Sequence, residues 1–246
     1  MRAMILAAGL GTRLRPLTDE RPKALVEVAG HTLLEITLRR LREFGINQVI
    51  VNVHHFSDML VDYLKKNDDF GMQIAISREQ DLLDTGGGLK NAAWFFSEDA
   101  NEPFLLHNVD VLSTIDLGRM VEFHRQHQAL ATLAVQDRET SRYLLFDNEH
   151  LLCGRQAERH QPPEMVRPSP TTQKLAFSGV HVISPRFLSL MTEQGVFSII
   201  TSYLRLAAQG EKIMAFRADA YYWRDLGKPE NLAQAEQDVR HQLLQL

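Results

Sequence analysis

The hydrophobic positions of the chain alternate between short continuous runs and runs with helical spacing. Residues 3–8 are apolar throughout, as expected of a strand buried on both faces of a sheet. Within residues 31–44, Leu34, Leu38 and Leu41 recur at the spacing of a helix. The same reasoning predicts further strands at 49–53, 72–76, 104–107, 131–135 and 177–183, and helices at 89–96, 117–127 and 198–209, from Ser57, near Phe187 and from Pro229.

Strands that alternate with helices of this length predict right-handed βαβ units. We therefore expect an α/β fold, a three-layer α/β/α sandwich with a Rossmann-like, mixed and mainly parallel sheet. A strand pair through Phe216 and Trp223 is expected near the end of the chain. Residues 1–246 are expected to form a single domain.

Residues 155–174 interrupt this pattern and hold four of the nine prolines, which predicts an irregular loop. Two interpretations are open for this loop. It is either a solvated surface excursion or a cover over an anionic ligand, and the second interpretation rests on its basic residues, Arg155, Arg159, His160 and Arg167.

Composition narrows the function classes. A net charge of −4 gives no global attraction to nucleic acid or to an anionic membrane surface, and no apolar stretch approaches the ~20 residues of a membrane span. The first residues resemble a signal peptide, but the apolar run is brief and ends in a Gly/Arg loop, so we expect no cleavage. The single cysteine, Cys153, cannot form an internal disulfide, which fits a cytoplasmic enzyme. The sequence is compatible with a homo-oligomer.

A glycine-rich, basic loop follows the first predicted strand. Its start, Gly9-Leu10-Gly11-Thr12-Arg13, lies at the sheet edge where α/β proteins bind ligands, and its backbone N–H groups suit a phosphate. It is neither the dinucleotide fingerprint, which requires glycine at Leu14, nor a P-loop. Arg13 and Lys23 add fixed charge, although a tight turn with solvated cations is the alternative.

The stretch LAAGLGTRLRPLTDERPK, residues 6–23, resembles the signature of the sugar-1-phosphate nucleotidyltransferases at every fixed position. The resemblance continues through V-N-V-H-H at 51–55, D-T-G-G-G at 84–88, N-V-D-V at 108–111, F-S-G-V at 177–180 and W-R-D-L-G at 223–227. It is greatest to the short single-domain branch that includes N-acetylmuramate-1-phosphate uridylyltransferases and mannose-1-phosphate guanylyltransferase-like proteins. The fold it implies is of the nucleotide-diphospho-sugar transferase type.

The resemblance implies that a sugar-1-phosphate oxygen attacks the α-phosphate of a nucleoside triphosphate and releases pyrophosphate. Because the nucleophile is already an anion, the protein must supply positioning and positive charge rather than a general base. By the family's motif, Arg13 holds the leaving pyrophosphate and Lys23 bridges the α-phosphate and the sugar phosphate. Arg13, Lys23 and Asp110 are the expected catalytic residues.

Magnesium is the expected cofactor, since phosphate oxygens pair with a hard cation held by a few carboxylates and water. Asp110 and Asp225 each follow an apolar run that reads as a strand, where a sheet could bring them together. The alternative for each is an ordinary strand-end or turn aspartate. Val109 stands where the family often has glycine.

The remaining binding residues follow from the motifs. Three glycines after Thr85 either admit a nucleobase or ribose against bare backbone before a helix, or form a plain helix N-terminus. The expected nucleotide-binding residues are Ala8, Gly9, Gly11, Thr12, Arg13, Thr85, Gly86, Gly87 and Asn108, and the expected sugar-binding residues are Lys23, Gly179 and Asp225. His54 and His55 are expected to be structural, because they lack further spaced ligands for a metal.

The D-T-G-G-G segment favours UTP as the nucleotide, by its resemblance to the uridylyltransferase branch. The alternatives are a mannose-1-phosphate guanylyltransferase, a phosphocholine cytidylyltransferase-like enzyme and a non-catalytic nucleotide-sugar sensor. A sensor has no need of a cation set that neutralises an attacking phosphate, which Arg13 and Lys23 supply. The family's Glu-Lys-Pro segment around the sugar phosphate is not visible, so the sugar is not identified.

Overall fold

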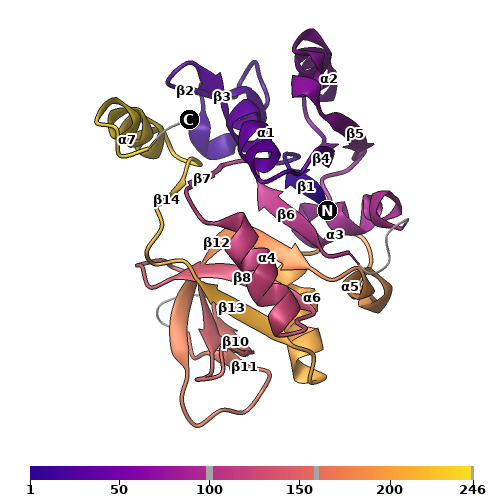
Figure 1. Cartoon of the computed structure of the whole chain (residues 1–246), viewed down its shortest axis with the longest axis vertical. Helices are drawn as coiled ribbons and strands as arrows, with labels where there is room; N and C mark the ends of the chain where they lie inside the picture. Colours follow the sequence, from indigo (N-terminus) through magenta and orange to yellow (C-terminus); the bar gives the residue numbers. More distant parts are fainter. Residues whose placement is uncertain (98–101, 158–160, 245–246) are drawn as a thin grey trace.

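One mixed sheet of ten strands organises the fold (Figure 1). The computed structural model describes residues 1–97, 102–157 and 161–244. Four neighbouring strands run parallel from the centre of this sheet to one edge, in the order β6 (Phe104–Asn108), β1 (Arg2–Leu6), β4 (Gln48–Val53) and β5 (Gln73–Arg78).

Beyond β6 the sheet becomes antiparallel. The long strand β12 (Gln173–Ile183) pairs with β6, β8 (Ala131–Gln136) and β9 (Tyr143–Phe146), while β13 (Ile213–Arg217) runs parallel to β8. The far edge consists of β10 (Leu152–Gln156) and β11 (Glu164–Met165). The expected mixed sheet, parallel at its centre, is confirmed.

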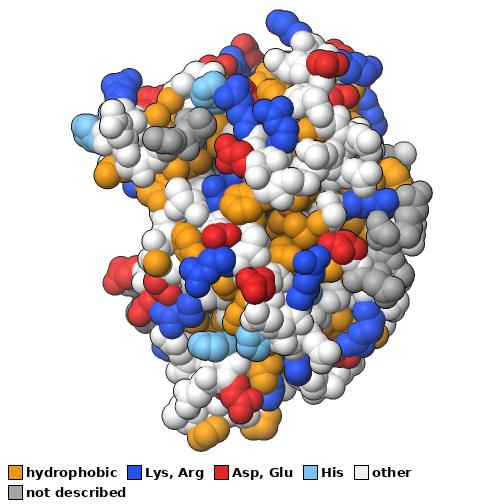
Figure 2. Space-filling view, viewed as in Figure 1, with side chains coloured by type: hydrophobic (Ala, Val, Ile, Leu, Met, Phe, Trp, Pro, Cys, Tyr) orange, Lys and Arg blue, Asp and Glu red, His pale blue; other side chains and the backbone are white. Residues whose placement is uncertain are grey.

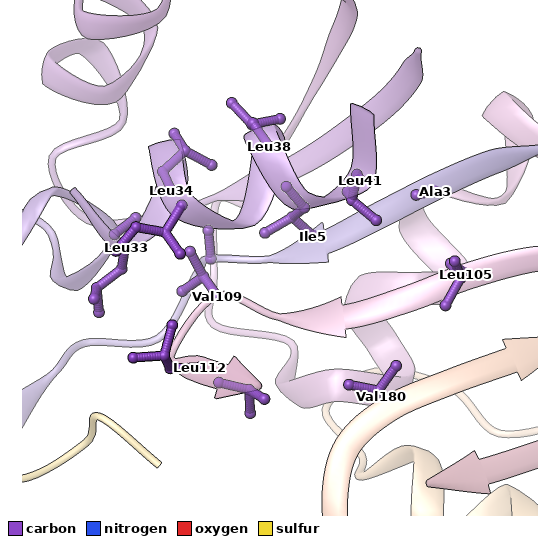
Figure 3. Packing of buried hydrophobic residues seen from close by; sticks show 14 of the residues in the cluster. Ala3, Ile5, Leu33, Leu34, Leu38, Leu41, Leu105, Val109, Leu112 and Val180 are labelled. Atoms are coloured by element: carbon purple, nitrogen blue, oxygen red, sulfur yellow. The ribbon is translucent and has the colours of Figure 1, made fainter. Parts of the chain in front are cut away.

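Helices cover both faces of the sheet, because the central strands are apolar on both sides. Ala3 and Ile5 of β1 pack with α1 (Leu33–Glu43) in one hydrophobic cluster, as Figure 3 shows, whereas Met4 belongs to a second cluster on the opposite face. Each of these three side chains is 0% exposed. The first cluster also takes in side chains of α2 (Ser57–Lys66), α4 (Leu117–Gln126) and α7 (Pro229–Arg240), and the second those of α3 (Asp84–Asn91), α5 (Arg186–Leu190) and α6 (Ile199–Ala208).

Local chemistry sets several helix ends. The Thr32 hydroxyl accepts a hydrogen bond from the Glu35 N–H at 3.1 Å and caps α1, and Pro229 occupies the first turn of α7 as predicted. Ser57 begins α2 as predicted but does not cap it, although serine often caps helices, because the residue before the helix is Phe56 in a left-handed conformation, with φ of 54°. Short elements complete the chain: β2 (Glu27–Val28), β3 (His31–Thr32), η1 (Thr12–Leu14), η2 (Lys23–Leu25), η3 (Asp68–Gly71) and η4 (Ala93–Phe96).

Two small strands correct a second prediction. The expected strand pair through Phe216 and Trp223 does not form, since β13 pairs with β8 and β14 (Trp223–Asp225) pairs instead with β7 (Val111–Ser113). The strand β7 directly follows Asp110, so this antiparallel pair joins two segments far apart in the sequence.

The Pro-rich segment 155–174 is only partly irregular, because β10 extends to Gln156, β11 lies within the segment and β12 begins at Gln173. Arg155 pairs with Glu164 at 2.6 Å, and Arg167 lies 3.9 Å from Asp147. Arg159 and His160 fall at positions 159 and 160, outside the described residues. The described part therefore forms the edge of the sheet opposite β5, with its cations directed to nearby carboxylates.

The surface does not concentrate charge of one sign on the face shown in Figure 2, where Lys and Arg side chains interleave with Asp and Glu. Within the described ranges, no helix has the length and apolar character needed to cross a membrane.

Candidate active site

A pocket of about 350 Å³ opens where β1, β4 and β6 end. This is the carboxyl edge of the parallel strands, the usual ligand site of open α/β sheets. Its walls include the predicted nucleotide-binding residues Ala8, Gly9, Thr85 and Asn108, together with Lys23 and Asp110. The other lining residues are Leu6, Ala7, Asn52, Glu79, Leu82, Asp84, Val109 and Val196.

Lys23 and Asp110 form an ion pair in this pocket. Lys23 begins the short helix η2 directly after Pro22, and its residue is only 9% exposed. Asp110 lies in the turn between β6 and β7. A cation and a carboxylate in contact in a small pocket are a suitable setting for phosphate chemistry.

The pairing of β7 with β14 brings Asp225 to the same end of the sheet. Asp225 lies opposite Val111, and the Leu226 N–H donates to the Asp110 carbonyl at 2.8 Å. One carboxylate oxygen of Asp225 accepts the Gly227 N–H at 2.7 Å. The two aspartates, 115 positions apart, are therefore brought together by a ladder of backbone hydrogen bonds.

Arg13 lies beside Asp225. A Cβ on Gly227 would fall 2.5 Å from Nη2 of Arg13 and 2.7 Å from Oδ1 of Asp225, so only glycine leaves room for both groups. Arg13 is exposed, and no hydrogen bond or ion pair engages its side chain within residues 1–97, 102–157 and 161–244. Its guanidinium is available to an anion.

Gly11 gives the loop its shape, since its φ of 66° is left-handed and a Cβ there would lie 2.9 Å from the Thr18 side chain. The Thr18 hydroxyl donates to the Gly11 carbonyl at 2.9 Å and closes the turn. Gly11 and Thr12 shape the loop but do not line the pocket.

The glycines of the D-T-G-G-G segment are not in a loop, so the expectation of bare backbone before a helix is wrong. Helix α3 begins at Asp84 and contains all three. The Gly86 and Gly87 N–H groups donate to the Phe197 carbonyl at 2.9 and 3.3 Å, and the Thr85 hydroxyl accepts the Ile199 N–H at 3.0 Å. The glycines allow residues 195–197 to pack closely on the helix, and only Asp84 and Thr85 of the segment line the pocket.

Gly87→Ala is expected to lower the free energy of unfolding by roughly 1–3 kcal/mol, because the new Cβ would lie 2.5 Å from the Gly195 carbonyl oxygen. Urea unfolding measures the change. Gly9→Ala is the matched control, since a Cβ at Gly9 meets nothing within 4 Å. Equal stability of the two variants would contradict the packing role.

Sequence reasoning missed Asn52 and Glu79, which are 2% and 6% exposed. Asn52 Oδ1 accepts the Ala7 N–H at 2.7 Å, and its amide nitrogen donates to Glu79 at 2.7 Å. The other carboxylate oxygen of Glu79 accepts the Leu83 N–H at 3.0 Å. This network links the end of β1 to the start of α3 through the pocket floor. The signal available in the sequence was Asn52 within the apolar end of β4, whereas Glu79 follows the polar end of β5 and carries no such signal.

Asn108 and Gly179 lie together. Gly179 has φ of 75°, and a Cβ there would come 2.9 Å from the Asn108 amide nitrogen and 2.7 Å from the Val111 side chain. Gly179 lies within β12, where the pairing with β8 is irregular, and its backbone comes close to residues of β6 and β7 on the side of the site that carries Asp225. Gly179 does not line the pocket itself.

Histidines near the site are structural. His54 Nδ1 is hydrogen-bonded to the Glu79 carbonyl at 3.0 Å, and the His55 ring packs on Phe56. Burial lowers the pKa of His107 to about 4 and that of His181 to about 3, so both are neutral at pH 7. Neither supplies positive charge to a phosphate.

Asp110 and Asp225 fit a magnesium ion, which commonly takes one or two carboxylates and leaves its other positions to water and substrate phosphates. The described residues hold no group of three or more His, Cys, Asp or Glu side chains that could bind a metal. Two carboxylates would suit a hard cation shared with phosphate oxygens rather than a zinc ion held by nitrogen or sulfur.

Comparisons with known proteins agree with this geometry. The family model described as "Nucleotidyl transferase" matches residues 2–242. The N-acetylmuramate alpha-1-phosphate uridylyltransferase of Caulobacter vibrioides is 33% identical, with 95% of each chain covered. The mannose-1-phosphate guanylyltransferase catalytic subunit beta of Xenopus tropicalis is 32% identical, but the match covers 94% of this chain and only 62% of that protein. A crystal structure of a putative glucose-1-phosphate thymidylyltransferase from Bacillus anthracis superposes with a TM-score of 0.79 at 16% identity, covering 98% of this chain and 95% of that one, which shows the shared fold.

Proposed function

The chain belongs to the nucleotidyl transferase family and is a sugar-1-phosphate nucleotidyltransferase, and from that premise we propose that it transfers a uridylyl group from UTP to an N-acetylmuramate-like sugar 1-phosphate. The observation that carries the proposal is the buried Lys23–Asp110 ion pair in the pocket, with Arg13 and Asp225 beside it. These residues supply two cations and two carboxylates where two polyanionic substrates would meet.

In the proposed reaction an oxygen of the sugar 1-phosphate attacks the α-phosphorus of the nucleotide. A bond forms between that oxygen and the α-phosphorus, and the bond from the α-phosphorus to the oxygen bridging to the β-phosphorus breaks. The electron pair leaves with pyrophosphate. No proton needs to be removed from the nucleophile, so the chain's contribution is alignment and charge.

Lys23 is placed to neutralise the approach of the two phosphates. Its ammonium group is held by Asp110 in the pocket that residues 6–9 also line. A preorganised cation in a partly dry site stabilises developing charge far more than the same cation in water. Arg13, exposed and without a partner within the described part of the chain, would hold the leaving pyrophosphate.

Asp110 and Asp225 would hold Mg²⁺, which, when bound, supplies further positive charge to the phosphate oxygens. Asp110 would then bind the Mg²⁺ ion while it also contacts the ammonium group of Lys23. The hydrogen bond from the Gly227 N–H keeps Asp225 oriented toward the same end of the sheet.

The preference for UTP rests on the packing of the pocket wall. Since the glycines of α3 are covered by residues 195–197, they offer no bare backbone that would widen the pocket for a purine. Val196 of that segment lines the pocket together with Leu82 and is 66% exposed. The match to the uridylyltransferase over 95% of both chains supports the same nucleotide.

GTP with mannose 1-phosphate is the second candidate, and one observation favours it. The Glu79 carboxylate lines the pocket, and a carboxylate can accept from two adjacent donors of a guanine edge. Both of its oxygens already accept hydrogen bonds from the protein, which argues for the pyrimidine. A phosphocholine substrate has no comparable feature in its favour. We place the enzyme in the cytoplasm, consistent with the free, buried thiol of Cys153.

The test compares kcat/KM for UTP and GTP with one accepted sugar phosphate. If a purine leaves two polar groups of the pocket without the partners that a pyrimidine provides, each costs roughly 1–3 kcal/mol. UTP would then be preferred by about a hundredfold or more. Val196→Ala should reduce that preference by ~3-fold or more by opening the wall, whereas Leu243→Ala, equally exposed but outside the pocket, should not. Equal values, or a preference for GTP, would overturn the uridylyl assignment.

A further inference from the structure

Arg138 carries a partly buried charge that forms no ion pair among the described residues. It follows β8, and its guanidinium lies over the Trp223 ring, 3.6 Å from the ring centroid. One nitrogen, Nη2, donates to the Phe177 carbonyl at 2.8 Å, but the buried Nε has no acceptor. Among the described side chains, no carboxylate forms an ion pair with it.

Two other partly buried arginines have carboxylate partners. Arg224 lies 2.8 Å from Asp238, and Arg205 lies 2.8 Å from Glu193, each in a contact between a helix and its neighbouring segment. A half-buried guanidinium without a paired carboxylate is costly, so an anionic ligand would be a favourable partner for Arg138. An arginine's planar fork matches a carboxylate or a phosphate.

Arg138 adjoins the sugar side of the site. Trp223 lies two residues before Asp225 in β14, and its ring N–H donates to the Ser178 carbonyl at 2.8 Å, next to Gly179. Burial lowers the pKa of Arg138, and the nearby Asp225 charge opposes that effect. The guanidinium is thus fixed beside the residues expected to contact the sugar, and apart from the Lys23–Asp110 pair.

We propose that Arg138 binds a carboxylate carried by the sugar, so that the substrate class is a carboxylated sugar 1-phosphate. The inference rests on the proposed function, in which Lys23 and Arg13 take the phosphates. The anion left for Arg138 is then a substituent of the sugar ring. Trp223 holds the guanidinium plane in place, which limits the conformational entropy lost on binding.

The experiment uses two sugars that differ only in the lactyl ether that carries the carboxylate, N-acetylmuramate 1-phosphate and N-acetylglucosamine 1-phosphate, with the wild-type enzyme and Arg138→Gln. The wild type should prefer the carboxylated sugar. Arg138→Gln should lower its kcat/KM by about 30-fold or more and change that of the neutral sugar by less than ~3-fold, as expected for loss of a charge-assisted hydrogen bond. Arg186→Gln removes an exposed arginine of α5 that pairs with Glu211, and it should leave both kcat/KM values unchanged.

Equal losses on both sugars, or a wild type that does not discriminate between them, would overturn the inference and leave nucleotidyl transfer standing. Absence of turnover by the wild type with every nucleotide and sugar phosphate would instead refute the proposed function. If Arg138→Gln fails to fold by circular dichroism, Arg138→Lys replaces it. A preference reduced ~10-fold or more then supports bidentate recognition, and an unchanged preference overturns it.

Discussion

Lys23→Ala is expected to lower turnover by ~100-fold or more while leaving the fold intact. Lys23 is 9% exposed and lies in the pocket against Asp110, so its charge acts where the dielectric is low. Removing it leaves the repulsion between the attacking sugar phosphate and the α-phosphate uncompensated. The carboxylate of Asp110 also loses its partner, which adds to the effect.

Steady-state pyrophosphate release measures this loss, and urea unfolding confirms that the variant is folded. Lys212→Ala is the matched control, since Lys212 is exposed and its ammonium group donates to the His127 carbonyl at the end of α4, outside the pocket. The control should retain wild-type turnover. A loss smaller than ~3-fold for Lys23→Ala would remove Lys23 from the mechanism.

Asp110→Asn and Asp225→Asn should each raise the magnesium concentration required for half-maximal activity by about 10-fold or more. An amide keeps the shape of the side chain but loses the charge that attracts the cation. Asp110→Asn should have the larger effect on turnover, because Asp110 also contacts Lys23, whereas Asp225 is held by the Gly227 N–H.

Magnesium titrations of both variants at saturating substrate provide the measurement. Asp58→Asn is the control, because the Asp58 side chain is 86% exposed and pairs with Arg78 on the surface of α2. Its titration curve should match that of the wild type. A wild-type curve for either site variant would show that the aspartate concerned is structural.

The layer architecture could be predicted because each central strand is continuously apolar and each helix has one apolar stripe. The residues of 3–8 are buried except for the partly buried Leu6, and Leu34, Leu38 and Leu41 are fully buried, as their spacing predicts. The strands β9 and β10 were not predicted, because they lie near the sheet edge around the Pro-rich segment, where apolar and polar residues alternate only weakly. The pairing of β14 with β7 could not be predicted either, since a three-residue strand takes its partner from tertiary packing.

The candidate site was predictable where one segment carries the chemistry, as with Lys23, and less so where packing decides. Nothing local to Gly86 and Gly87 indicates that Phe197, more than a hundred positions later, will accept their N–H groups. Asn52 and Glu79 were likewise missed because their pairing joins two parallel strands at the pocket floor. The comparisons identify the family, while the sugar and the base depend on such long-range contacts.

The most direct test of nucleotidyl transfer is to follow the α-phosphorus of labelled UTP in the presence of N-acetylmuramate 1-phosphate and the wild-type enzyme. The label should move into a nucleotide sugar with release of one pyrophosphate for each transfer, and only when the sugar phosphate is present. If the label stays in the triphosphate, or appears as nucleoside monophosphate independently of the sugar, for each of the common nucleoside triphosphates and a panel of sugar phosphates, the assignment of this site is contradicted.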